Sequence, residues 1–245
     1  MKTANSVANE IPCTAKSIDR FVKSEMLSLT NETVRYDLAE SVCSDLTLSD
    51  VLGEADYKNL AATPLGYSSA AGNSQLRELI AQRHNDVSAD DVVITVGGMH
   101  ALFLLGQILC VDDKEILIHQ PSFPLTVLAT QTTNMSVRTF RSDFQHRYRI
   151  RPDAVEQQLS PSTGLLFLEN PRNPSGVCTD ASTVSALLHS MKRVCPDAYL
   201  VIDETYREAS YANSGSIASM MDKDLGIRYP RLVVTGSLSK SHGAP

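Results

Sequence analysis

The sequence predicts an α/β fold with three layers, in which a mostly parallel sheet lies between two layers of helices. Short runs rich in β-branched residues alternate with stretches of helical periodicity. The short runs are almost continuously apolar, which is typical of strands buried on both faces of a parallel sheet. We expect strands at 92–96, 115–118, 136–140, 164–168, 198–202 and 231–235.

Helices are expected between these strands and before them. Apolar residues recur at helical spacing over 15–30, and a short helix is expected after Asp45, within a mixed stretch at 31–66. From residue 74 the signals strengthen. The remaining helices are expected at 74–84, 98–110, 123–133, 152–159 and 181–194.

Composition narrows the class of protein. The 245 residues are 42% hydrophobic and 20% charged, as is ordinary for a globular protein, and the net charge of −6 argues against nucleic-acid and anionic-membrane partners. No apolar run reaches the roughly 18 residues of a membrane span, and residues 1–10 lack the apolar stretch of a signal peptide. Five scattered cysteines indicate reduced thiols and no metal site. We therefore expect a cytoplasmic protein.

Small, aromatic and amide residues follow three of the expected strands. Ligands bind at the carboxyl edge of a parallel sheet, so these positions are candidate sites. Gly98 opens the helix after the first strand and suits a phosphate, although a tight turn alone explains it better. Phe123 follows the second strand and suits either a stacked ring or the core. The run NPRNPSG at 170–176 is a firmly held loop that presents amide groups or is simply rich in proline.

A carboxylate and an amine follow the last two strands. Asp203 ends the fifth run, where a buried carboxylate needs a positive partner such as a protonated ring nitrogen; a structural ion pair or helix cap is the alternative. Lys240 lies in a small-residue loop after the sixth run. It is either an exposed loop lysine or a desolvated amine that forms a Schiff base.

Taken in order, these elements resemble the class I/II aminotransferases, which are pyridoxal-phosphate (PLP) enzymes of fold type I. The resemblance runs from about residue 60 to Pro245. It rests on the motifs GYSSAAGNSQLR at 66–77, NPRNPSG at 170–176, VIDETY at 201–206 and SLSKSHGAP at 237–245.

The resemblance implies a role for each position. Lys240 would form the Schiff base with PLP and move the proton between substrate and cofactor. Asp203 would pair with the pyridine nitrogen, Asn173 and Tyr206 would bind the ring's 3-oxygen, and Phe123 would stack on the ring. The phosphate would be held by backbone N–H groups of Gly98 and Met99, by the Ser237 hydroxyl, and by Tyr67 reaching across from the partner of a homodimer. Met99 departs from the Ser or Thr that is common at its position, which removes one hydroxyl contact.

The resemblance also implies a domain organisation. We expect residues 1–45 to form an N-terminal arm and residues 46–245 to form the PLP-binding large domain. In the family, the motif continues into an arginine that clamps the phosphate, an antiparallel strand, and a C-terminal small domain. These are absent here, so we expect an incomplete large domain and a fragment that is weakly active or inactive.

The implied activity is transfer of an amino group between an amino acid and a 2-oxo acid. The same residue set supports other PLP chemistry on amino acids, as in β-lyases, decarboxylases and oxidases. A regulator with an aminotransferase-like domain and a pseudo-enzyme without ligand are further alternatives. The acidic charge and the lack of a basic recognition helix oppose the regulator.

Overall fold

In the part of the chain that the structure describes, the sheet consists of five parallel strands. A computed structural model describes residues 35–36, 41–44, 46–109, 113–130, 133, 135–210 and 217–244. Within them the strand order is β2-β1-β3-β4-β5. The predicted parallel sheet is confirmed. Its strands are β1 (Glu115–Gln120), β2 (Ser136–Arg141), β3 (Thr163–Glu169), β4 (Tyr199–Asp203) and β5 (Leu232–Thr235).

The helices match most of the predicted positions. Helix α9 has the predicted bounds, whereas α5, α7 and α8 are shorter than expected. Helix α4 was not predicted, and the predicted helix at 15–30 lies outside the described residues. The bounds are α3 (Leu48–Val51), α4 (Glu54–Ala61), α5 (Ser74–Ala81), α6 (Gly97–Ile108), α7 (Pro124–Thr130), α8 (Pro152–Glu156) and α9 (Ala181–Val194), with 3-10 turns η1 (Ala89–Asp91), η2 (Arg207–Ala209) and η3 (Lys223–Leu225).

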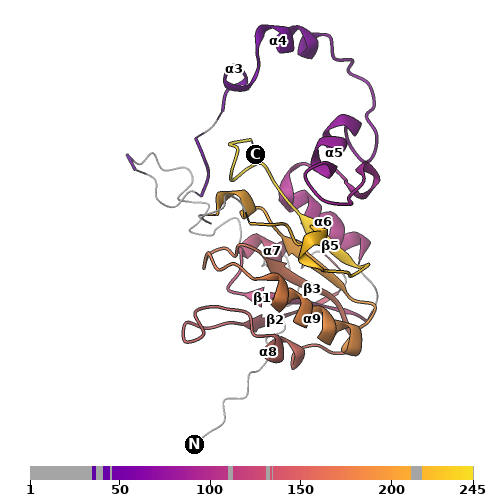
Figure 1. The fold of residues 1–245 in the computed structure, drawn as a ribbon, viewed down its shortest axis with the longest axis vertical. Coiled ribbons are helices and arrows are strands. Elements are labelled where there is room, and N and C mark those ends of the chain that lie inside the picture. The colour runs from indigo at the N-terminus through magenta and orange to yellow at the C-terminus, as the bar shows by residue number, and fades with distance from the viewer. Residues whose placement is uncertain are drawn as a thin grey trace, which may run out of the picture.

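Helices cover both faces of the sheet, which confirms the three-layer architecture (Figure 1). Successive strand residues point to opposite faces, so each strand contributes to two cores. One core packs strand residues such as Leu166 and Leu200 against Leu187 of α9. The other packs Ile116 and its neighbours against α6, and α6 contacts α7.

Local features of the sequence explain where helix α9 begins and ends. The Asp180 carboxylate accepts a hydrogen bond from the N–H of Thr183 at 2.7 Å and so caps the first turn. Lys192 and Arg193 lie in the last turn, where the helix dipole favours cations. The buried side chains between these ends follow helical spacing: Val184, Leu187, Leu188 and Met191.

The predicted strand at 92–96 is wrong. Its residues are not part of the sheet, and the N–H of Ile94 instead bonds the carbonyl of Ala71 at 2.9 Å. Strand β5 is an edge strand, with β4 as its only neighbour among the described strands. A β-rich run becomes a strand only when another strand pairs with it, and no strand of the described part lies between β5 and this run.

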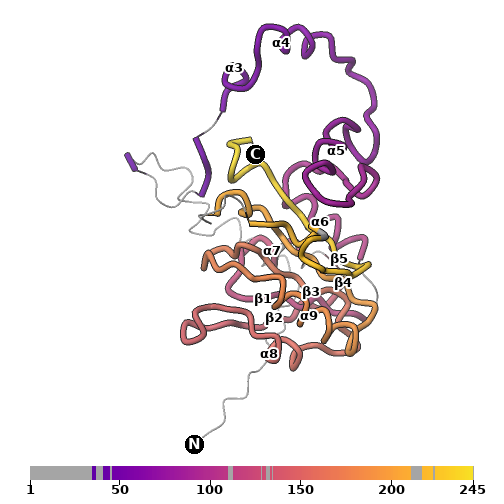
Figure 2. The backbone as a smooth tube through the Cα atoms, viewed as in Figure 1, coloured from indigo at the N-terminus to yellow at the C-terminus, as the bar shows by residue number. Residues whose placement is uncertain are grey.

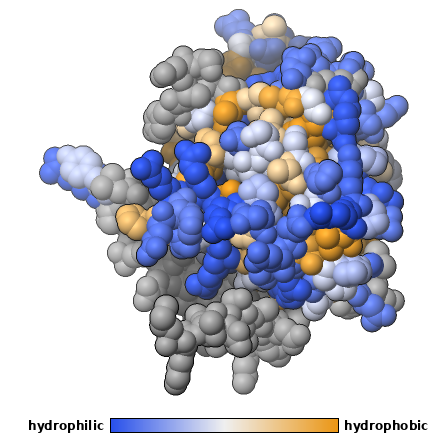
Figure 3. All heavy atoms as spheres, turned by 60° about the horizontal axis from the view of Figure 1, so that its bottom comes forward, coloured by the Kyte–Doolittle hydropathy of each residue, from blue (hydrophilic) through white to orange (hydrophobic). Residues whose placement is uncertain are grey.

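The chain from α3 through α4 arches away from the sheet and returns as α5 (Figures 1 and 2). Neither α3 nor α4 has a buried residue. Large apolar side chains are exposed along this stretch, including Leu65 and Tyr67 in the loop that precedes α5. By contrast, the face in Figure 3 is mainly hydrophilic, with smaller hydrophobic patches between polar side chains. Within the described part of the chain, every helix is too short or too polar to span a bilayer.

Truncation of a central strand residue tests this core. Leu200 of β4 is fully buried, so we expect Leu200→Ala to lower the free energy of unfolding by about 2–5 kcal/mol. Leu79 of α5 is 54% exposed, and Leu79→Ala is expected to change it by less than about 1 kcal/mol. Urea denaturation followed by circular dichroism measures both. Equal losses in the two variants would contradict the assigned core.

Candidate functional site

Asp203 stands at the carboxyl end of β4 with a set of hydroxyl and amide donors around it. Its Oδ1 atom accepts hydrogen bonds from Thr205 Oγ1 at 2.7 Å, from the N–H of Thr205 at 3.0 Å and from Thr235 Oγ1 at 3.1 Å. Desolvation raises the pKa of this carboxyl, and the hydrogen bonds oppose the rise. Oδ2 accepts no hydrogen bond from the described residues, so one carboxylate oxygen is left for a further donor.

Three of the residues predicted for the site lie together near the carboxyl ends of β3 and β4. Asn173 Nδ2 donates to the Tyr206 hydroxyl at 3.4 Å, and Lys240 Nζ lies 5.9 Å from the centre of the Tyr206 ring. These residues come from three different loops, which follow β3, β4 and β5. The sheet therefore brings an amide, a phenol and an amine into one cluster, as the strand-end reasoning predicted.

The N-terminus of α6 lies beside this cluster. A side chain at Gly98 would come within 3.5 Å of Thr205 Oγ1 and 3.9 Å of Ser237 Cβ, so the helix start is adjacent to two loops of the site. The N-cap side chain, Val96, makes no capping hydrogen bond, and the first turn carries no acidic residue. The N–H of Val96 itself donates to His100 Nδ1 at 3.2 Å. Met99 turns its side chain toward the core. Only its backbone N–H is then available to a ligand, in keeping with the predicted loss of a hydroxyl contact.

Phe123 is linked to the cluster through a carboxylate that the sequence analysis did not single out. Its N–H donates to Glu169 Oε1 at 2.9 Å, and the N–H of Asn173 donates to Glu169 Oε2 at 3.1 Å. Glu169 is the last residue of β3 and is 6% exposed. Phe123 itself is half-buried in the loop before α7, so it is not a core residue.

Tyr67 lies apart from the other predicted residues. It belongs to the loop between α4 and α5, and its side chain is fully exposed. Among the described residues it makes no contact with the cluster.

Residues 41–44 lie against the loop after β5 that contains Lys240, here called the lysine loop. The Ser41 hydroxyl is 2.7 Å from the Tyr206 hydroxyl, and Cys43 Sγ donates to the Lys240 carbonyl at 3.3 Å. Figures 1 and 2 show this segment beside the C-terminal end of the described chain. Sequence analysis missed these contacts because they join positions 165 and 197 residues apart. It also missed Thr205 and Thr235, although Thr205 stands two residues after Asp203, a spacing typical of side-chain-to-backbone turns.

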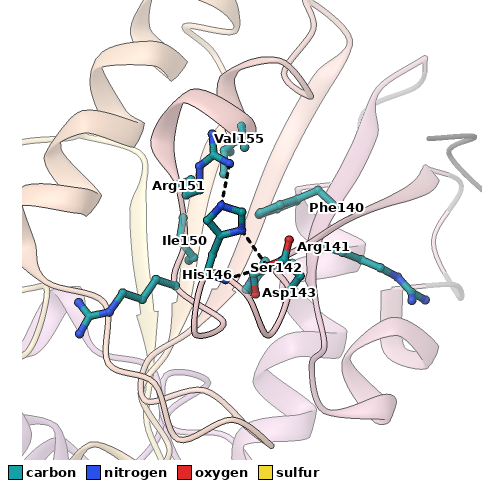
Figure 4. A pocket seen from close by; sticks show the side chains of 11 residues that line it. Phe140, Arg141, Ser142, Asp143, His146, Ile150, Arg151 and Val155 are labelled. Carbon is teal, nitrogen blue, oxygen red and sulfur yellow. Dashed lines mark hydrogen bonds and ion pairs between the residues drawn. The ribbon is translucent and has the colours of Figure 1, made fainter. Parts of the chain in front are cut away.

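A small pocket lies at the carboxyl end of β2, away from the predicted residues (Figure 4). It encloses about 50 Å³ and none of the predicted site residues lines it. His146 lies in this pocket between Arg151 and Asp143, and Arg141 extends away from it. Burial lowers the pKa of His119, another lining residue, to about 3, so that imidazole is neutral. The cluster of Asn173, Tyr206 and Lys240, here called the lysine cluster, is therefore the better candidate for a catalytic site.

The comparisons with known proteins point to one family. Residues 35–245 match the model of the class I and II aminotransferases. The aspartate aminotransferase of Thermotoga maritima is 30% identical over 243 residues, which cover 96% of this chain and 61% of that protein. The arginine–pyruvate transaminase of Pseudomonas aeruginosa is 26% identical over 198 residues, or 77% of this chain and 48% of that protein.

Solved structures give the same picture. The crystal structure of the Thermotoga maritima aspartate aminotransferase has a TM-score of 0.72 at 25% identity, covering 94% of this chain and 60% of that one. A PLP-dependent aminotransferase from Streptococcus suis has a TM-score of 0.78 at 20% identity, covering 95% and 60%, which shows the shared fold. This chain therefore spans about half to three fifths of the length of these relatives.

A buried carboxyl next to the site makes stability depend on pH. Glu204 is 6% exposed, it accepts the N–H of Met220 at 2.7 Å, and burial raises its pKa from 4.5 to about 7. Because the folded state holds this proton more tightly, the stability it contributes is present below pH 4.5 and is lost as pH rises through about 7.

Glu204→Gln removes this titration while it keeps an acceptor for Met220. We expect the variant to gain stability relative to the wild type as pH rises from 4.5 to about 7, by up to roughly 3 kcal/mol. Urea denaturation of both proteins across this pH range measures the difference. If the free energies of unfolding of the two proteins changed with pH in parallel, Glu204 would not be a neutral acid in the folded state.

Proposed function

Because the chain belongs to the class I and II aminotransferase family, we propose that it is the cofactor-binding part of a PLP-dependent aminotransferase with Lys240 as its catalytic amine. The observation that carries this proposal is the cluster at the carboxyl edge of the sheet. There the Lys240 amine lies over the Tyr206 ring, and the Tyr206 hydroxyl meets the Asn173 amide. A loop lysine with no such neighbours would have no evident role.

The residues present fit PLP. Asp203 keeps one carboxylate oxygen without a donor among the described residues, which suits a protonated ring nitrogen. The uncapped start of α6 suits the phosphate, because the first N–H groups of a helix lack partners within it and lie at its positive end. These two features are independent of each other and lie on neighbouring elements.

Each predicted site residue then has a binding role. Asn173 and Tyr206 would donate to the 3-oxygen of the ring, and Phe123 would stack on its face. The backbone N–H groups of Gly98 and Met99 and the hydroxyl of Ser237 would hold the phosphate. Asp203 would keep the ring nitrogen protonated, and a positive partner would in turn favour its ionised form against the desolvation that raises its pKa.

The proposed reaction depends on a proton that Lys240 moves. PLP supplies an electron sink for the charge that develops at the substrate α-carbon. The free Lys240 amine would take the proton from that carbon and return it at the C4′ carbon of the cofactor. Asp203 would hold a proton at the ring nitrogen throughout. Tyr206 lies within reach of both the amine and the Asn173 amide, so it would orient both groups.

The substrates are proposed at the level of class, as an amino acid donor and a 2-oxo acid acceptor. The relatives are named for aspartate, prephenate, arginine and histidinol phosphate, and this variety favours no single substrate. We further propose that residues 46–245 belong to the PLP-binding large domain, with residues 1–45 as an N-terminal arm.

We also propose a homodimer in which Tyr67 acts on the partner's phosphate. Its side chain is fully exposed among the described residues, and neighbouring apolar residues on the same stretch are exposed as well. Exposed apolar side chains of this kind are typical of surfaces that a partner covers.

Reductive trapping tests the role of Lys240. Borohydride reduction of the chain incubated with PLP is expected to attach the cofactor to the peptide that contains Lys240, because only an amine-linked cofactor is trapped in this way. Lys240→Arg keeps the positive charge and is expected to trap none. Lys192→Arg, on the exposed side of α9, is the control and should label like the wild type. Peptide mass spectrometry reads the result, and equal labelling of all three proteins would refute the assignment.

Mixed dimers test whether Tyr67 acts across an interface. Lys240→Arg and Tyr67→Ala chains are each expected to bind PLP weakly. If Tyr67 serves the partner's site, a mixed dimer contains one site with an intact lysine and an intact tyrosine. Mixing the variants should then restore tight PLP binding to a fraction of sites in an equilibrium dialysis assay. No restoration, in a mixture shown by mass spectrometry to contain mixed dimers, would contradict the proposal.

A further inference from the structure

The Glu169 carboxylate connects two loops of the candidate site. It ends β3 and is 6% exposed. Oε1 accepts the N–H of Phe123 at 2.9 Å and Thr126 Oγ1 at 3.3 Å, and Oε2 accepts the N–H of Asn173 at 3.1 Å. One buried side chain thereby bonds the loop after β1, the start of α7 and the loop after β3.

These hydrogen bonds join the backbone of the two residues that are predicted to contact the PLP ring from different loops. Phe123 and Asn173 lie outside the strands, so no ladder hydrogen bond fixes their N–H groups. Moving either backbone would carry the aromatic ring or the amide with it. A buried carboxylate is costly unless donors surround it, and here two loop N–H groups and one hydroxyl of α7 do so.

Resting on the function proposed above, we propose that Glu169 is a positioning residue that holds Phe123 and Asn173 in their cofactor-binding arrangement. It need not touch the cofactor, because its bonds are to the backbone of residues that do. No ion pair with Glu169 occurs among the described residues, so the N–H and O–H donors are its direct partners.

The charge of Glu169 matters for this role. An ionised carboxylate accepts hydrogen bonds at both oxygens, whereas a proton on one oxygen weakens one of the two loop contacts. The pKa is about 7, raised chiefly by burial and also by the Asp203 carboxylate on β4, and lowered by its N–H donors. Arg172, in the same loop as Asn173, is the cationic group that interacts with it. The two loops should therefore be held more firmly as pH rises through about 7.

Glu169→Gln and Glu204→Gln form a matched pair for the test. Both glutamates are 6% exposed, and burial raises the pKa of each to about 7. Glu204 bonds Met220 and lies near Arg207, neither of which is a predicted site residue. A glutamine at position 169 accepts at one oxygen only and turns an NH₂ group toward the second N–H.

The first measurement is PLP affinity of the 245-residue chain by equilibrium dialysis, at pH values on both sides of 7. Glu169→Gln is expected to bind about tenfold more weakly above pH 7, since a hydrogen bond to a charged group is lost. The ratio of wild-type to variant affinity should rise with pH, and titration of PLP itself cancels in that ratio. Glu204→Gln should match the wild type. Equal affinities of wild type and Glu169→Gln at all pH values would overturn the proposal.

The second measurement needs no cofactor. Hydrogen exchange of the Phe123 and Asn173 amides should be faster in Glu169→Gln than in the wild type and unchanged in Glu204→Gln. Unchanged exchange at both amides in Glu169→Gln would also overturn the proposal. A wild-type chain that binds no PLP would refute the proposed function instead, and the exchange result would still decide whether Glu169 holds the two loops.

Glu169→Asp provides a second variant in case glutamine prevents folding. Aspartate keeps the charge but is one methylene shorter, so it cannot reach both N–H groups. Weaker PLP binding by this variant, with a native circular dichroism spectrum, would support the positioning role. Wild-type affinity in the aspartate variant would show that charge alone suffices and would overturn it.

Discussion

The carboxyl edge of the sheet holds two acidic side chains in register, and the arrangement of the surrounding loops depends on this pair. Glu169 on β3 and Asp203 on β4 are paired residues of neighbouring strands. Burial raises the pKa of both carboxyls, and the Asp203 carboxylate raises the pKa of Glu169 further. Neither has an ion-pair partner within 4 Å among the described residues. Hydroxyl and amide donors from the adjoining loops must therefore stabilise them.

The need to stabilise these two carboxylates explains why the adjoining loops donate hydrogen bonds to the ends of β3 and β4. The threonines at 205 and 235 turn their hydroxyls to Asp203, and backbone N–H groups from two loops turn to Glu169. The residues that are proposed to face a ligand are thereby held in place, because their backbones are the donors or lie next to them. An acidic sheet edge of this kind is suited to a ligand that brings positive charge to one carboxylate and leaves the other to organise the protein.

Much of the fold was predictable because its signals are local. Five apolar runs became strands, and α9 could be bounded to the residue from its cap and its periodicity. The run at 92–96 has the same composition as those strands, yet it is not one, since strand formation depends on a partner that a local pattern does not reveal. Helix α4 was missed for the opposite reason. It buries none of its side chains, so it has no apolar stripe to detect.

The candidate site also has a part that could be predicted from the sequence and a part that could not. The proximity of Lys240, Asn173 and Tyr206 could be predicted because strand order brings the loops after parallel strands to one edge of the sheet. The hydrogen bonds that organise them could not be named. Glu169 follows the predicted strand at 164–168, and its hydrogen bonds to Phe123 and Thr126 join positions 46 and 43 residues apart in the sequence.

The contact between residues 41–44 and the lysine loop has a consequence for how the protein folds. Cys43 and Lys240 are separated by 197 residues, and the whole sheet lies between them in the sequence. Contacts this distant form slowly, because the intervening chain must be ordered before closing the loop is favourable. During synthesis, the serine that meets Tyr206 leaves the ribosome long before its partner exists. We therefore expect the contact between residues 41–44 and the Lys240 loop to form late in folding, after the sheet.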